Sequence, residues 1–194
     1  SIHLLKENLK SYRGKKLLII TEPLLNKLDL LDNLETIVKM NNIEYHIHFA
    51  SKIQVRLDDI DGDYDFRGNN IDLIIGIGSE DLLNYTKFIA VFLTNGKDLF
   101  HRIKTQQHIN KNLPTILIPT TFTTGNEVSP RIYVEKFHFP AMINHLFFVP
   151  SLIVYDPKIL VHLTPYERAS LSLSILSHAL ESFFIVKENR WLVN

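Results

Sequence analysis

The sequence contains no cysteine among its 194 residues. This absence excludes a disulfide framework, a thiolate metal site and a cysteine nucleophile. Neither sign of charge is in excess, because 21 basic side chains balance 21 acidic ones, so no global field attracts nucleic acid or an anionic membrane. No apolar run approaches the roughly 20 residues that a membrane span needs, and the first residues lack a secretion-signal pattern. We therefore predict a cytoplasmic protein with no nucleic-acid partner and no membrane span.

Short apolar runs of strand length alternate with amphipathic helical patterns along most of the chain. Strands are predicted at residues 17–20, 43–49, 71–75, 115–118, 131–135 and 152–155, and helices at residues 4–12, 23–38 and 80–93. The connections between them are short, and crossovers between parallel strands are right-handed. The predicted fold class is therefore α/β, with a Rossmann-like and mostly parallel sheet.

The last part of the chain has a different character. Thr164, Pro165 and Glu167 form the pattern of a capping box, in which the threonine hydroxyl and the glutamate each accept a backbone amide proton at a helix start. A largely apolar helix is expected over residues 166–184, and such a helix needs covering on most sides. Either it packs on the sheet domain, or it is the first helix of a further domain.

An acidic stretch lies between the second and third predicted strands, at residues 58–65. Its carboxylates resemble a calcium-binding loop only superficially, because the distal glutamate that completes such a loop is missing. We interpret the stretch as a solvated loop.

One polar segment directly follows a buried strand, where open α/β sheets bind ligands. Gly76, Gly78 and Ser79 lie between the strand at residues 71–75 and the next helix. Glycines allow the backbone to approach a phosphate, and amides at a helix start donate hydrogen bonds to its oxygens. The same residues also make a tight structural turn, so both interpretations stay open.

A second polar segment, residues 119–127, follows the strand at residues 115–118. It places four threonine hydroxyls beside a glycine, which is more than a turn requires. These hydroxyls suit ribose and phosphate oxygens. Alternatively, they satisfy the loop's own backbone groups.

Several short blocks resemble one known family. Residues 113–121 (LPTILIPTT) and 124–128 (TGNEV) look like its LPTIAIPTT and TGSEV strings, and residues 71–79 (IDLIIGIGS) look like its strand and GGGS loop. Asp156-Pro157 and residues 177–182 (SHALES) follow in the family's order. On these blocks the chain resembles the iron-containing (group III) alcohol dehydrogenases.

The resemblance implies a two-domain dehydrogenase. Residues 1–158 correspond to an α/β domain that binds NAD or NADP, and residues 159–194 to the start of a truncated, all-helical domain that carries a metal ion. The cofactor-binding residues it implies are Glu22, Gly76, Gly78, Ser79, Thr120, Thr121 and Thr124. A carboxylate at position 22 accepts from a ribose hydroxyl and repels a 2′-phosphate, so NAD is favoured over NADP. Alternatively, Glu22 only stabilises a helix start.

His178 matches a metal ligand of the family, in which an aspartate one helical turn away faces the same ion. In this sequence that position is Ser174, and a hydroxyl is a poor ligand for Fe²⁺ or Zn²⁺. The family's two other histidine ligands fall beyond residue 194. His178 is therefore either a remaining metal ligand or a histidine packed in a helical bundle.

Other positions depart from the family pattern. Ile77 replaces the middle glycine of the phosphate loop and adds bulk where the backbone must approach a ligand. Asn126 replaces a serine, and Lys87 lies two residues further from Ser79 than the family's lysine does, which puts its equivalence in doubt. Lys136 is the nearest counterpart of a lysine close to the cofactor. The remaining histidines lack metal-ligand spacing and are expected to be surface or core residues: His138, His145 and His162.

Three interpretations fit these residues. The chain is part of an alcohol dehydrogenase that acts on a small alcohol or aldehyde, or a degenerate relative that binds a nucleotide without turnover, or a subunit that completes another polypeptide. The replacements at positions 77, 126 and 174 favour the second, because truncation alone leaves earlier motifs unchanged. The resemblance is compatible with a homodimer or a partner chain. We expect dehydrogenase ancestry and little independent activity.

Overall fold

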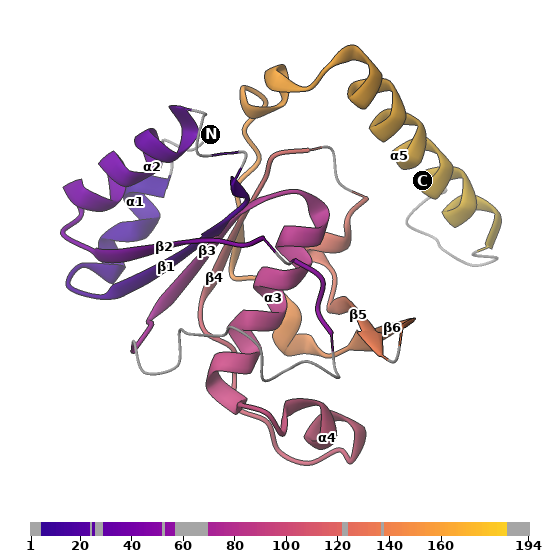
Figure 1. Cartoon of the computed structure of the whole chain (residues 1–194), viewed down its shortest axis with the longest axis horizontal. Coiled ribbons are helices and arrows are strands. Elements are labelled where there is room, and N and C mark those ends of the chain that lie inside the picture. Colours follow the sequence, from indigo (N-terminus) through magenta and orange to yellow (C-terminus); the bar gives the residue numbers. More distant parts are fainter. Residues whose placement is uncertain are drawn as a thin grey trace.

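A computed structural model describes residues 5–23, 25, 29–51, 53–56, 70–121, 124–136 and 138–185. Its centre is a sheet of five parallel strands in the order β2-β1-β3-β4-β7. The strands are β1 (Lys16–Thr21), β2 (Glu44–Phe49), β3 (Leu73–Gly78), β4 (Thr115–Pro119) and β7 (Leu152–Ile153). Helices lie on both sides of this sheet (Figure 1). The predicted α/β fold with a parallel sheet is confirmed.

The central strands are buried on both faces, which explains their continuous apolar runs. In β1, Leu17 and Ile19 face one half of the core, whereas Leu18 and Ile20 face the other half. The edge strand β2 instead alternates between exposed and partly buried residues. The core is therefore split by the sheet into two layers.

One helical layer covers each face of the sheet. α1 (Leu5–Leu9), the 3-10 helix η2 (Lys10–Tyr12) and α2 (Asp29–Met40) pack on the first face. α3 (Glu80–Asn95) packs on the second face and is followed by α4 (Leu99–Lys104). Residues 82–92 of α3 are all buried, and the ring of Phe88 lies 5.2 Å from Phe92 and 5.6 Å from Phe100. α3 is thus the helix that organises this half of the core.

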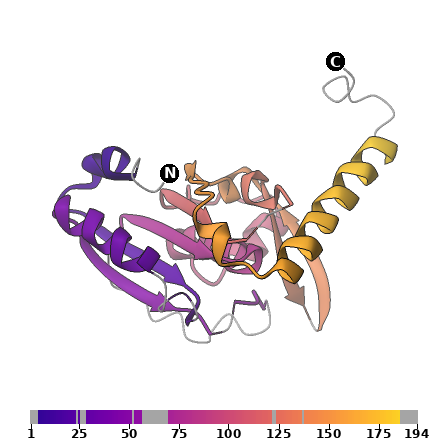
Figure 2. The same ribbon diagram turned by 90° about the horizontal axis from the view of Figure 1, so that it is seen from above.

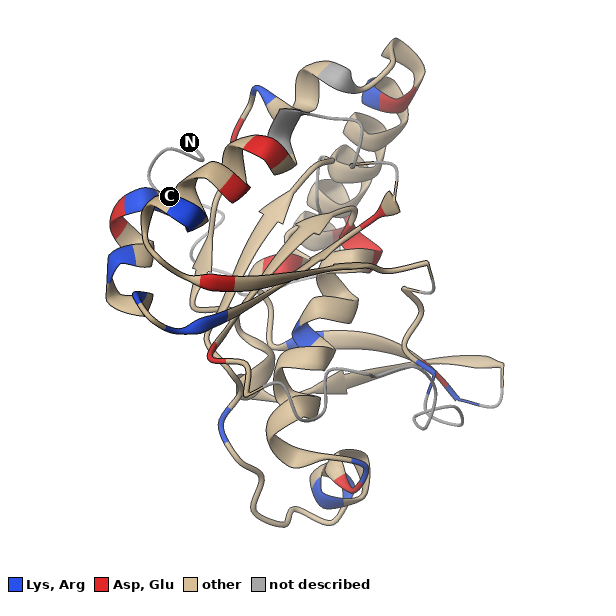
Figure 3. Cartoon of the chain, turned by 60° about the vertical axis from the view of Figure 1, so that its left-hand side comes forward, with Lys and Arg blue, Asp and Glu red and all other residues tan. Residues whose placement is uncertain are grey.

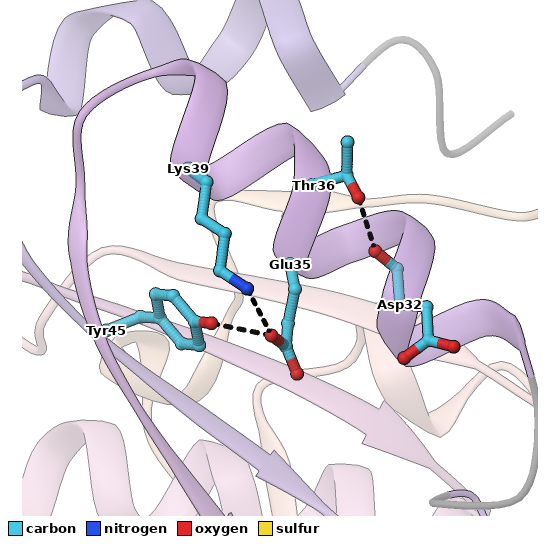
Figure 4. A network of polar contacts seen from close by, with 5 residues as sticks. All are labelled: Asp32, Glu35, Thr36, Lys39 and Tyr45. Carbon is cyan, nitrogen blue, oxygen red and sulfur yellow. Dashed lines mark hydrogen bonds and ion pairs between the residues drawn. The ribbon is translucent and has the colours of Figure 1, made fainter.

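A polar network joins α2 to the edge strand (Figure 4). Glu35 accepts hydrogen bonds from Lys39 Nζ at 2.9 Å and from the Tyr45 hydroxyl at 2.6 Å. These two bonds, with that of Tyr45 the stronger influence, hold the pKa of Glu35 below its ordinary value. The Thr36 hydroxyl donates to the carbonyl oxygen of Asp32 at 2.8 Å along the same helix.

A two-stranded antiparallel sheet lies outside the main sheet. β5 (Arg131–Lys136) pairs with β6 (Phe139–Asn144), and Ile132 and Val134 are buried in the cluster around α3. The Asn84 side chain of α3 holds β5, because it donates to the Tyr133 carbonyl and accepts from the Tyr133 N–H, each at 2.7 Å. The sequence pattern does not predict β6, whose residues are exposed or half-buried and include a proline.

The described part of the chain ends with the 21-residue helix α5 (Pro165–Ile185), reached through the 3-10 helices η5 (Leu146–Phe148) and η6 (Ile159–His162). The predicted capping box is present: Thr164 N–H donates to Glu167 Oε2 at 2.7 Å, and Glu167 N–H donates to Thr164 Oγ1 at 3.2 Å. α5 projects away from the sheet in both views (Figures 1 and 2). Its exposed apolar side chains are Tyr166, Leu173, Ile175, Leu176, Leu180, Phe183 and Phe184.

Several predicted boundaries are wrong: the strand expected from residue 71 begins at Leu73, and the strand expected to reach residue 155 ends at Ile153. The helix after β1 begins at Asp29, because Pro23 and Leu25 instead form a short 3-10 turn in which Leu25 N–H donates to the Glu22 carbonyl at 3.0 Å. β3 continues through Gly78, because the strand stays paired with β4 as far as Pro119. The acidic stretch at residues 58–65 lies outside the described residues.

Within the described ranges, no helix combines the length and the apolar character that crossing a membrane requires. Basic and acidic side chains are interspersed over the elements visible in Figure 3. This distribution agrees with the balanced charge of the sequence.

Candidate functional site

Gly76 and Gly78 lie within β3, where their small size allows α3 to approach. A Cβ atom on Gly76 would come within 2.5 Å of Thr86 Oγ1, and one on Gly78 within 2.5 Å of Leu82 Cδ2. Either side chain would therefore push against α3. Close packing of helix on strand, rather than approach of a ligand, already requires glycine at both positions.

Ile77 points away from α3. Its side chain is fully buried in the cluster beneath α1 and α2, because successive residues of a strand face opposite sides of the sheet. The expectation that Ile77 adds bulk at a phosphate loop is therefore wrong. Its replacement of a glycine fills the core on the far face.

Glu22 and Ser79 meet at the carboxyl end of the sheet. Ser79 is the residue that precedes α3, and its N–H donates to Glu22 Oε1 at 3.2 Å, while its hydroxyl donates to the same oxygen. A carboxylate at this end of a helix is favoured by the helix dipole. The interpretation of Glu22 as a helix-start carboxylate describes this geometry, and a contact with ribose stays a prediction.

The threonine-rich segment after β4 lies over the start of α3. The Thr120 N–H donates to the Gly78 carbonyl at 3.0 Å, and Thr120 is buried. The Thr124 hydroxyl donates to Glu80 Oε1 at 2.9 Å. The segment thus brings its polar groups to the same end of the sheet as Ser79.

A cavity of about 590 Å³ opens beside this segment, between the sheet edge and α5. Its lining residues are Pro119, Thr121, Thr124, Gly125, Glu127, Tyr155, Asp156, Pro157, Leu160, Ile175, His178, Ala179 and Ser182. The cavity unites Thr121, Thr124 and His178 from the predicted set, whereas Glu22 and Ser79 lie outside its lining. Its size and its mixture of apolar and polar groups suit a small ligand.

Two cavity residues were not assigned roles from the sequence. Glu127, in the 3-10 helix η4 (Asn126–Val128), is only 4% exposed and accepts a hydrogen bond from the Tyr155 hydroxyl. A carboxylate in an otherwise polar turn gives no sign of this burial. Its partner Tyr155, which follows β7, is distant in the sequence.

The described residues do not fit a metal ion. None of their histidine, aspartate and glutamate side chains form a group of three or more that could hold one. His178 lines the cavity from α5, and one turn earlier Ser174 offers only a hydroxyl. This donor set does not support Fe²⁺ or Zn²⁺ at His178.

Lys87 is a buried cation whose role sequence reasoning missed. Its side chain leaves α3 and donates to the carbonyl oxygens of Asn126 at 2.8 Å, Ser129 at 2.9 Å and Arg131 at 2.6 Å. Burial lowers the pKa of Lys87 to about 8, although the nearby Glu127 carboxylate raises it. The available signal was a lysine inside an apolar helical stretch, residues 85–92.

The structure also places the other residues that the sequence analysis singled out. Asn126 is buried, and its side-chain oxygen accepts from the Ser129 hydroxyl at 2.8 Å. Lys136 is exposed at the end of β5. His138 is exposed and lies 3.1 Å from Glu135, as expected for a surface residue. His145 accepts from the Phe147 N–H at 3.2 Å, and the side chain of His162 lies outside the described residues.

Comparison with known proteins identifies the family to which the chain belongs. The family model for iron-containing alcohol dehydrogenases matches residues 1–157. The chain belongs to the iron-containing alcohol dehydrogenase family, as its sequence blocks predicted.

Individual relatives agree with this assignment. The chain is 27% identical over 181 residues to long-chain-alcohol dehydrogenase 1 of Geobacillus thermodenitrificans, covering 91% of this chain and 46% of that protein. The fold is similar to sulfoacetaldehyde reductase from Bifidobacterium kashiwanohense in complex with NAD⁺ (TM-score 0.79, 19% identity, 94% of this chain and 49% of that chain). It is also similar to an iron-containing alcohol dehydrogenase from Thermotoga maritima (TM-score 0.78, 24% identity, 94% and 51%). The chain spans about half the length of these relatives.

Proposed function

We propose that this chain binds NAD at the carboxyl edge of its parallel sheet and serves hydride transfer between a small alcohol and an aldehyde. The observation that carries the proposal is the convergence of Ser79, Thr120 and Thr124 at the start of α3, beside the 590 Å³ cavity. In this proposal residues 1–158 form the dinucleotide-binding domain, and residues 159–194 begin a helical domain.

Each part of the edge suits a different part of a dinucleotide. The backbone amides at the start of α3 suit the pyrophosphate, because they are donors at the positive end of a helix. Glu22 suits the hydroxyls of the adenosine ribose. The cavity, with Thr121 and Tyr155 among apolar residues, suits the nicotinamide ring and the reacting carbon. Gly76 and Gly78 contribute by holding α3 close enough for this arrangement.

The chemistry of the reaction assigns a limited task to this chain. NAD⁺, when bound, would supply the hydride acceptor for the carbinol carbon, so that the alcohol becomes an aldehyde and the hydroxyl proton is released. The chain's residues bind the dinucleotide, orient its ring and exclude water from the cavity.

A second candidate function is nucleotide binding without turnover. Ser174 favours it, because a hydroxyl stands where the family resemblance implies a carboxylate ligand. Alcohol oxidation by the purified chain, measured together with its metal content, separates the two functions. Alcohol turnover with stoichiometric metal supports the dehydrogenase function. NADH binding without turnover and without metal supports the second candidate.

Titration of NADH into the full chain, followed by nicotinamide fluorescence, tests the binding site. Thr121→Val removes a hydroxyl from the cavity wall and keeps the side-chain shape, and we expect it to weaken NADH binding by about tenfold or more. Thr36→Val on α2 is the matched control and leaves the affinity unchanged. A folded wild-type chain that shows no saturable binding, or equal affinities for both variants, contradicts the proposal.

Cofactor preference tests the place of Glu22. Glu22→Gln keeps the shape of the side chain but removes the charge that repels a 2′-phosphate. We expect the ratio of NADPH to NADH affinity to rise by about tenfold. The control is Glu44→Gln, an exposed carboxylate at the amino end of β2 and hence at the opposite end of the sheet, and it leaves the ratio unchanged. An unaltered ratio in Glu22→Gln places the adenosine ribose elsewhere.

A further inference from the structure

Lys87 and the segment that it holds lie directly behind the cavity wall. All three donor directions of its ammonium are used, because the carbonyl oxygens of Asn126, Ser129 and Arg131 lie 2.6–2.9 Å away. These carbonyls come from one stretch of chain that runs from η4 to the first residue of β5. Thr124 and Glu127, which belong to the same stretch, line the cavity. One side chain of α3 therefore fixes the backbone from which the cavity wall is built.

We propose that Lys87 is a positioning residue of the dinucleotide site, holding residues 126–131 against α3 so that Thr124 and Glu127 face the cavity. This inference rests on the function proposed above. Lys87 itself lies behind the wall and contacts the backbone rather than the cavity lining.

Composition explains why the segment depends on a cation. Residues 124–131 contain a glycine in the left-handed region at φ 90°, five polar or charged residues, a proline and a single valine, and they offer little apolar surface to pack on α3. The Ser129 hydroxyl adds a hydrogen bond to the Asn126 carbonyl at 2.9 Å, within the segment itself. The bonds from Lys87 Nζ link the segment to the helix, together with the bond from the Thr124 hydroxyl to Glu80. An apolar residue at position 87 removes the lysine donor from the carbonyls of Ser129 and Arg131, whereas the Asn126 carbonyl keeps the Ser129 hydroxyl.

The charge of Lys87 can be removed without a mutation. Burial lowers the pKa of Lys87 to about 8, and the carboxylates that face it are Glu127 from η4 and Glu80 from α3. Above that pH the amine has two N–H donors and a lone pair for three carbonyls, so one carbonyl loses its bond. The loss of that bond is offset because burial disfavours the charged form. An opened, solvated segment would hold the proton more tightly, so a rise in pH through about 8 does not favour opening.

The test compares wild type, Lys87→Met and Lys104→Met, an exposed lysine control on α4. Amide hydrogen exchange of the ligand-free chains and NADH affinity are both measured. We expect Lys87→Met to speed exchange across residues 126–132, to leave β1 and β3 unchanged, and to weaken NADH binding by about tenfold.

Each result decides one of the two proposals. If wild type binds NADH and Lys87→Met binds it equally well, the positioning role is overturned and the cofactor site stands. If wild type binds no NADH but residues 126–132 lose protection in Lys87→Met, the cofactor site fails and Lys87 is only a structural link. If Lys87→Met does not fold, Lys87→Gln decides, because it keeps two N–H donors without the charge. Wild-type exchange at residues 126–132 with wild-type NADH affinity overturns the proposal, and faster exchange with weaker binding supports it.

Discussion

Gly78 lies where β3 and α3 come closest, and the absence of a side chain there sets their separation. We expect Gly78→Ala to lower the free energy of unfolding by about 1–3 kcal/mol, because its Cβ would lie 2.5 Å from Leu82 Cδ2 and 2.9 Å from Leu82 Cβ. Urea unfolding followed by circular dichroism measures the loss.

A double-mutant cycle with Leu82→Ala supplies the control for this prediction. Leu82→Ala removes the Cδ2 and Cγ atoms that the new methyl group would meet, although it also costs stability because Leu82 is fully buried. The added cost of Gly78→Ala should be smaller in the Leu82→Ala background. Equal costs in both backgrounds mean that the strain arises from the strand backbone and not from contact with α3.

Lys87 predicts a pH dependence of stability with a definite sign. Its pKa is about 8 in the folded chain, against an ordinary value of 10.5, so the unfolded chain binds more protons between these pH values. The free energy of unfolding therefore rises with pH across this window, by about 3 kcal/mol relative to Lys87→Met. Denaturation of both proteins from pH 7 to pH 10.5 measures the difference, and parallel curves contradict it.

Residue roles were predictable from the sequence only where a motif carried them. Ser79 and Thr124 lie at the carboxyl end of the sheet, as their blocks indicated, because residues that directly follow buried parallel strands emerge at that end. Lys87 and Glu127 were not predictable, because each owes its burial to a segment far away in the sequence. Ile77 was misjudged because the strand was expected to end before it, which hid the face it occupies.

At the scale of elements, the capping box of α5 is a local device that the sequence predicted fully. Thr164→Ala removes the acceptor of the Glu167 N–H and the hydroxyl that donates to Glu167 Oε2 at 2.7 Å. We expect the first turn of α5 to lose about 1 kcal/mol of local stability, measured by amide exchange. Ser170→Ala in the same exposed helix is the control and leaves the first turn unchanged.

The same substitution makes a prediction about ionisation. The Thr164 side chain, followed by its backbone N–H, holds the pKa of Glu167 below its ordinary value. In Thr164→Ala the pKa of Glu167 should therefore move upward, as followed by an NMR titration of its carboxyl carbon. An unchanged pKa assigns the effect to the backbone bond alone.

Elements were predictable in proportion to how local their signals are. The buried runs of β1, β3 and β4 and the capping box of α5 are short-range patterns, and each forms, although β3 extends further than expected, to Gly78. β6 escaped prediction because it is stabilised by pairing with β5 rather than by its own periodicity. The start of α2 was placed too early because Pro23 is compatible both with a helix start and with the 3-10 turn that it forms.

At the scale of the whole molecule, the sheet domain and α5 are stabilised in different ways. The five strands bury apolar side chains on both faces, whereas α5 exposes most of its apolar residues, among them Leu173, Leu176 and Phe184. Regions with few buried contacts open locally at a small fraction of the global free energy. We therefore expect amides of α5 to exchange by local opening, and amides of β1 and β3 to exchange only by global unfolding.

Hydrogen exchange in increasing urea separates these two modes, because only global opening exposes enough surface to depend strongly on denaturant. Exchange of α5 should be nearly independent of urea, and exchange of the central strands should follow the unfolding curve. Leu176→Lys probes the same point, since a charge on an uncovered face should change the free energy of unfolding by no more than about 0.5 kcal/mol. If α5 instead shares the protection of β3, and Leu176→Lys removes that protection, then in solution the apolar face of α5 is covered, and the sheet domain does not account for the stability of the molecule alone.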